Sequence, residues 1–174
     1  MDTTALDLGL LILRVGLAIV LFAHSTQKLF SWFSGSGPAA SAALFEKLGQ
    51  HPGKPMVYLA ATCEMAAAVS MLLGFLTPVG AAVGVGTMVV AGSSLMLLNG
   101  SFWNSAGGGE YPFVLALVLA ALAFTGPGSL AVDPYLSLPL ADRPVLVGVL
   151  ALVLGLAAAV PPVQRARSSR AVTL

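Results

Sequence analysis

Residues 8–30 of the chain read LGLLILRVGLAIVLFAHSTQKLF. The hydrocarbon core of a bilayer is roughly 30 Å thick, and about 20 residues of helix cross it, so this segment is long and apolar enough to span a membrane. It also carries Arg14, His24 and Lys28, which are costly to place among lipid tails. The segment therefore predicts a membrane-spanning helix with one polar side that faces protein.

The composition of the whole chain indicates the same class of protein. The 174 residues are 57% hydrophobic and 9% charged, with a mean hydropathy of +0.94, whereas about a quarter of a soluble domain is charged. Since the alternating pattern of a membrane barrel is missing, we expect an all-α transmembrane helical bundle. A net charge of +1 and a single cysteine, Cys63, argue against nucleic-acid binding, an internal disulfide and a thiolate zinc site. After residues 8–30, the predicted spans are 56–75, 78–98, 111–125 and 145–160.

The distribution of basic residues predicts the orientation in the membrane. Lys47 and Lys54 follow the first span, and a basic tail over residues 163–174 follows the last. The positive-inside rule places both in the cytoplasm, and an odd number of spans then leaves the N-terminus outside. Between the first two spans we expect a short interfacial helix near residues 38–49. We therefore expect a multi-pass protein of the cell membrane with its C-terminus in the cytoplasm. The arginines of the tail are Arg165, Arg167 and Arg170.

The charged residues of the first two spans are expected to meet. On a helical wheel of about 100° per residue, Arg14, His24 and Lys28 fall on one side of the first span. From the rise of a helix, Glu64 lies about 12 Å from the inner end of the second span and His24 about 9 Å from the same end. Because these depths are similar, His24 and Lys28 are the expected partners of Glu64. Arg14 lies about 12 Å further out, so a direct pair with Glu64 would need a long reach or a vertical offset between the two helices.

Glu110 adds a second acid at the inner side of the membrane. It lies just before Pro112 at the start of the fourth span, where a carboxylate complements the positive end of the helix dipole. The glycine-rich loop before it falls on the same side as His24, Lys28 and Glu64. We therefore predict one polar pocket near the cytoplasmic face. Its candidate residues are His24, Lys28, Glu64 and Glu110, with Arg14 as a further candidate nearer the outer end.

Two interpretations of these charges stay open. The side chains could contact a ligand, or they could fasten helices together while Lys28 reaches the interface. For Arg14 the structural or snorkelling role is favoured. Catalytic residues stay unknown, because no serine has a suitable His and Asp around it, and no metal-binding motif occurs. Cys63, about 100° from Glu64 around its helix, fits a packing residue better than a redox thiol.

Several short motifs occur in a set order along residues 8–133. They are LILRVGLA, HSTQKLF, LLGFLTP, MVVA, NGSFWN, the EYP that begins with Glu110, and GPGSLAVD. This ordered set resembles the DoxX family of small membrane proteins. The resemblance implies a core of four helices within residues 1–133. Residues 134–162 then form an outer loop and an additional fifth span, ahead of the basic tail. The chain departs from the family pattern at Ser25, where a glycine is common, and at Met96, where many members have a histidine.

The resemblance also implies a function. Members of the family are associated with membrane redox chemistry, which implies a subunit of a redox complex linked to a quinone or a small sulfur compound. Without a flavin, haem or metal motif, the electrons would come from a partner enzyme. We expect no covalently bound cofactor, and the expected ligand is a quinone or a small sulfur compound. Whether the chain itself is an enzyme stays open.

The alternative is a non-catalytic membrane anchor or scaffold. In that case the interfacial helix and the basic tail would recruit a cytosolic enzyme, and either role is compatible with a homo-oligomer. A small-molecule carrier is less favoured, because the spans show no inverted repeat and no pair of broken helices.

Overall fold

The computed structural model describes residues 3–171, and in this range every regular element is a helix. Single turns of 3-10 helix, Asn104–Ala106 and Asp133–Tyr135, lie in two of the connections. This confirms the predicted all-α class. The α-helices are α1 (Thr3–Phe30), α2 (Gly37–Lys47), α3 (Gly53–Leu73), α4 (Thr77–Asn99), α5 (Glu110–Thr125) and α6 (Pro144–Ala171).

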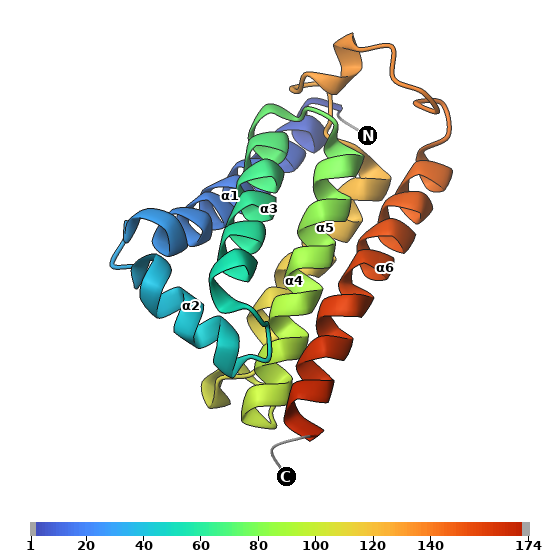
Figure 1. Cartoon of the computed structure of the whole chain (residues 1–174). Helices are drawn as coiled ribbons and strands as arrows, with labels where there is room; N and C mark the ends of the chain where they lie inside the picture. Colours follow the sequence, from blue (N-terminus) through green and yellow to red (C-terminus); the bar gives the residue numbers. More distant parts are fainter. Residues whose placement is uncertain (1–2, 172–174) are drawn as a thin grey trace.

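The five longer helices form a bundle whose two ends differ (Figure 1). Helix α1 packs against α3, α3 packs against α4, and α4 also packs against α5 and α6. The connection from α5 to α6 lies at the end of the bundle where α1 begins, and α2 lies toward the opposite end, where α6 ends (Figure 1). Below we call these the outer and the inner end, after the predicted orientation.

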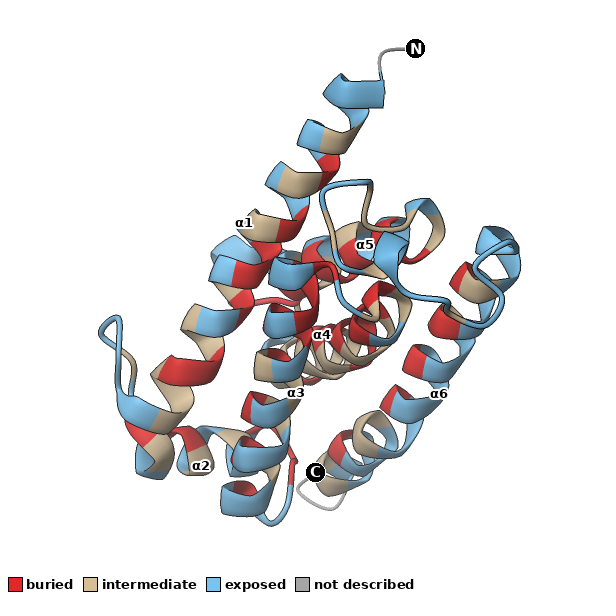
Figure 2. Ribbon diagram, turned by 90° about the horizontal axis from the view of Figure 1, so that it is seen from above, coloured by how far each residue is buried: buried red, intermediate tan, exposed pale blue. Residues whose placement is uncertain are grey.

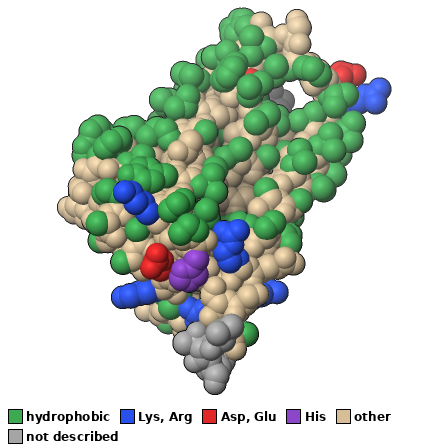
Figure 3. All heavy atoms as spheres, viewed as in Figure 1, with side chains coloured by type: hydrophobic (Ala, Val, Ile, Leu, Met, Phe, Trp, Pro, Cys, Tyr) green, Lys and Arg blue, Asp and Glu red, His purple; other side chains and the backbone are tan. Residues whose placement is uncertain are grey.

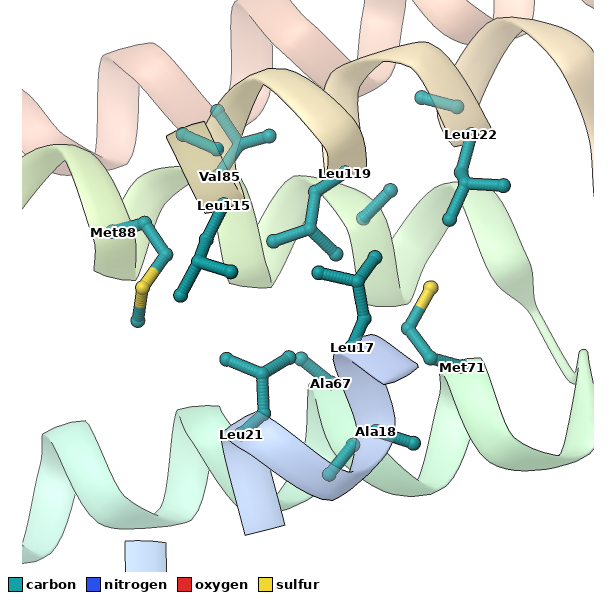
Figure 4. Packing of buried hydrophobic residues seen from close by; sticks show 14 of the residues in the cluster. Leu17, Ala18, Leu21, Ala67, Met71, Val85, Met88, Leu115, Leu119 and Leu122 are labelled. Carbon is teal, nitrogen blue, oxygen red and sulfur yellow. The ribbon is translucent and has the colours of Figure 1, made fainter. Parts of the chain in front are cut away.

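Apolar side chains from α1, α3, α4 and α5 fill the centre of the bundle (Figure 4). Leu21, Met71 and Leu119 are fully buried there. Helices α1 and α6 turn buried residues toward the other helices and leave exposed residues along their outer sides (Figure 2). The exposed residues include Ile12, Ile19, Val153 and Leu154. Apolar side chains on the outside of a bundle are expected where lipid rather than water is the solvent.

Four of the five predicted spans are long and apolar enough to cross a bilayer: α1, α3, α4 and α6. Helix α5 is apolar but has only 16 residues, because the loop before it contributes Glu110 alone. The helix therefore begins one residue before the predicted 111–125 span and ends where that span ends. The loop keeps its own fold, in which the Glu110 amide donates to the Phe102 carbonyl at 2.9 Å.

Helix α6 is longer than the sequence predicts. The prediction ended it near Pro161, since a proline inside a helix lacks the N–H donor and crowds the preceding turn. In the structure the helix continues through Pro161 and Pro162 to Ala171, so the basic residues up to Arg170 are helical. Packing on both sides of the prolines explains this, because Ala159 and Ala166 are both buried.

The short helix α2 lies close to the predicted 38–49 interval, at Gly37–Lys47. Its apolar side chains do not all point inward: Leu44 is 47% exposed. The connection between α3 and α4 is short. Gly74 ends α3 with φ 59° and ψ 42°, a conformation that glycine adopts most readily, and Pro78 lies in the first turn of α4.

Candidate functional site

Lys28 of α1 and Glu64 of α3 form an ion pair between the two helices. The Lys28 ammonium donates to both carboxylate oxygens, at 2.8 Å to Oε1 and 2.6 Å to Oε2. The Glu64 side chain is only 5% exposed and that of Lys28 19%. A carboxylate this deep in an apolar bundle needs a cation or donor beside it, and Lys28 supplies one. The predicted partnership of Lys28 and Glu64 is therefore present.

His24 lies one turn before Lys28 and joins the pair through its backbone. The third Lys28 hydrogen bond goes to the His24 carbonyl at 3.1 Å, so all three N–H groups of the ammonium have acceptors. The His24 ring packs edge-on against Tyr111 of α5, with ring centroids 5.9 Å apart. The imidazole is half-buried and close enough for the charges of Lys28 and Glu64 to act on it. His24 is thus beside the pair without a direct hydrogen bond to Glu64.

Two residues that the sequence reasoning did not assign to the pocket also position this site. The Ser25 hydroxyl is fully buried and donates to the Ala61 carbonyl of α3 at 2.8 Å, which ties α1 to α3 next to the ion pair. Ser25 stands where the family commonly has glycine, and that departure was the available signal. Nothing in the sequence context of Tyr111 pointed to His24.

Glu110 does not reach the ion pair through any hydrogen bond of the described residues. Its carboxylate accepts the backbone N–H of Asn104 at 3.0 Å, within the loop that precedes α5. Asn99 closes the same loop by donating to the Gly107 carbonyl at 2.7 Å. Glu110 therefore holds its own loop at the first turn of α5, next to Tyr111. The pocket prediction placed it among the membrane charges because it counted only charge and side of the membrane.

Arg14 belongs to a different cluster, at the outer end of α3. Its guanidinium donates to the carbonyls of Met71, at 3.2 Å, and Leu130. It is fully buried, with no exposed surface, so it does not snorkel to the interface. These hydrogen bonds place it away from Lys28 and Glu64, so the five predicted residues do not form one site in the described structure.

Asp133 and Asp7 complete this outer cluster, and the sequence reasoning overlooked both as structural groups. Asp133 accepts the N–H groups of Leu76 and Thr77 at 2.6 and 2.8 Å, which caps the start of α4. Asp7 accepts the Ser129 N–H at 2.8 Å and also its hydroxyl. The segment GPGSLAVD is thereby fixed over the ends of α1, α3 and α4. These contacts give a physical reason for the motif GPGSLAVD, which the sequence analysis noted only as part of the resemblance.

The described residues contain no group of three His, Cys, Asp or Glu side chains placed to hold a metal ion. A shallow groove of about 550 Å³ lies on the surface of the bundle between α3 and α4, and Met65, Val69 and Val79 are among its walls. This groove is almost entirely apolar and does not include His24, Lys28 or Glu64.

Comparison with known proteins gives one match. A protein-family model described as DoxX matches residues 9–97, just over half of the chain. The matched range contains the whole ion-pair site on α1 and α3, together with Arg14, and it ends before Glu110 and the segment GPGSLAVD. No curated protein and no solved structure matches.

Proposed function

The chain belongs to the DoxX family and is an integral, multi-pass membrane protein, and on this basis we propose that it serves as the membrane subunit of a redox complex. In this proposal the Lys28 and Glu64 pair, with His24 beside it, receives the polar head group of a quinone or of a small sulfur compound. The observation that carries the proposal is the ion pair itself. Ionisable residues inside a membrane span are rare, and they commonly mark sites of ligand or proton handling.

The geometry supports a division of roles among the three side chains. Lys28 is the hydrogen-bond donor, and a ligand carbonyl can replace the His24 carbonyl as its third acceptor without breaking the contact with Glu64. Reduction of a quinone takes up protons as well as electrons. His24 and Glu64 are the groups here that can exchange a proton, and a partner enzyme supplies the electrons. Tyr111 fixes the His24 ring by its edge contact.

The test measures binding of a short-chain benzoquinone to the purified protein in lipid nanodiscs. The informative variant is Lys28→Met with Glu64→Gln, which removes both charges together and leaves neither buried without a partner. Glu46→Gln is the matched control, since Glu46 is exposed and lies on α2. We expect the double variant to lose at least tenfold in affinity and the control to be unchanged. Equal affinity in all three proteins would remove this site from the proposal.

The alternative, a membrane anchor that recruits a cytosolic enzyme, is favoured by one feature of α6. The helix carries the exposed Arg165 and Arg167 on an ordered extension beyond its apolar segment, a fixed basic surface for an acidic partner. A pull-down from membranes with Arg167→Glu separates the two roles. Loss of a captured enzyme with quinone binding intact would favour the anchor.

A further inference from the structure

A cleft of about 620 Å³ opens at the inner end of the bundle, where α2, α4 and α6 all end. Its walls bring together side chains from three separate parts of the chain: Lys47 of α2, His51 of the connection to α3, and Arg170 of α6. Charged and histidine side chains gather at this end of the molecule, while hydrophobic ones cover most of the rest of the same face (Figure 3). The cleft therefore lies outside the apolar part of the bundle, at its boundary.

Among residues 3–171, the cations of this cleft have no acidic partner within ion-pair distance. No carboxylate in the described part of the chain forms a salt bridge with Lys47 or Arg170. Arg170 donates from Nη1 to the Leu97 carbonyl, and its Nε is buried without an acceptor among the described residues. Because a guanidinium has five N–H donors, this contact leaves most of its donors available. Arg165, five residues before Arg170 on α6, adds a further positive charge and donates to the His51 carbonyl at 3.3 Å.

Two features of the cleft act against a bound anion. The first is the carboxylate of Glu46, an acid in the lining. It is directed at the backbone of the α2–α3 connection, where it accepts the Gly53 N–H at 3.3 Å. The second is the partial negative charge at the carboxyl ends of α2 and α6, which stabilises the nearby Lys47 and Arg170 as cations. This helps to account for the position of the two side chains, but it does not supply an acceptor for the buried Nε of Arg170.

We propose that this cleft binds a phosphate group, carried by the head group of an anionic phospholipid or present as free phosphate. Arginine matches the oxygens of a phosphate through its planar fork of donors, and lysine adds a point charge. Basic pockets between helices at a membrane boundary suit phospholipid head groups for the same reason. The volume accommodates the glycerol of a head group as well as its phosphate. This site is separate from the Lys28 and Glu64 pair and does not depend on the redox proposal.

The test compares two double variants that remove the same number of charges from the same end of the protein. Lys47→Gln with Arg170→Gln changes the cleft, whereas Lys54→Gln with Arg167→Gln changes exposed cations outside its lining. Native mass spectrometry in detergent counts bound phosphatidylglycerol against phosphatidylcholine. We expect the cleft variant to lose about thirtyfold in affinity for phosphatidylglycerol, from about 1 kcal/mol for each of two cations, while the control retains wild-type affinity. An equal loss in both variants, or none in either, would overturn the proposal.

Further arms identify the source of the phosphate and guard against misfolding. Titration with inorganic phosphate alone, followed by a shift in thermal unfolding, supports a free-phosphate site if it protects the wild type and not the cleft variant. Protection by phosphatidylglycerol alone supports the lipid. Absence of protection by both refutes the site. Lys47→Gln by itself removes no hydrogen bond of the described structure, so a loss of binding in this variant cannot be attributed to unfolding.

Discussion

Replacing either Lys28 or Glu64 is expected to destabilise the protein, and the loss of Lys28 is expected to cost more than the loss of Glu64. Lys28→Met leaves a carboxylate whose side chain is 5% exposed without its cation. We expect this to lower the free energy of unfolding by about 3 kcal/mol, in the range measured for broken buried pairs and for charges in membrane spans. Glu64→Gln costs less, about 1 kcal/mol, because the amide oxygen remains an acceptor and Lys28, two residues from the end of α1, can extend toward the interface.

The double variant turns this asymmetry into a test. When both charges are removed together, the penalty of an unpaired group disappears, so stability is expected within about 1 kcal/mol of wild type. Unfolding by denaturant in mild detergent, followed by far-ultraviolet circular dichroism, measures all four proteins. The reasoning fails if Glu64→Gln is the more damaging single change. It also fails if the two single effects simply add in the double variant, since that would mean the side chains do not interact.

Other expected outcomes concern packing, capping and the attachment of α6. Gly155→Ala places a methyl group 2.6 Å from the Ala82 carbonyl oxygen of α4, and this backbone atom cannot move aside easily. We expect the free energy of unfolding to fall by about 2 kcal/mol, measured by thermal unfolding. Gly16→Ala is the control and is expected to be neutral, because the space around Gly16 is open. Asp133→Asn weakens the cap of α4 and should lower unfolding stability by about 1 kcal/mol, measured by the same thermal scan. Gln50→Leu removes hydrogen bonds to α4 and α6, so amide exchange should rise after the two prolines of α6 while α3 stays protected.

The helices could be predicted because the length of an apolar stretch is enough to specify a membrane span. Residues 8–30 already implied α1, and the pairing of Lys28 with Glu64 followed from the depth of each residue along its helix. Contacts between a side chain and a distant backbone carbonyl have no such signal. The Leu130 carbonyl that binds Arg14 is 116 residues away, and any residue type would present the same acceptor. The sequence therefore identified Arg14 as a buried charge and could not identify its partners.

The end of α6 and the role of Glu110 were mispredicted for a related reason. Local rules end a helix at consecutive prolines, but contacts made by buried Ala166 with the loop at Gly49 outweigh that preference. Glu110 was assigned by charge and depth, whereas a nearby backbone N–H, that of Asn104, is its actual partner. In both cases the deciding contact comes from tertiary structure, which periodicity and charge patterns do not report.

The distance along the chain between Arg14 and its acceptors bears on biosynthesis. Arg14 leaves the ribosome long before Met71 and longer still before Leu130, so the first helix cannot reach its final surroundings when it is inserted. Until the segment GPGSLAVD, which contains Leu130, has been translated, the Arg14 guanidinium must be solvated by water, lipid phosphate or the insertion machinery. Completion of the outer cluster is thus a late event that only a chain translated beyond Asp133 can reach.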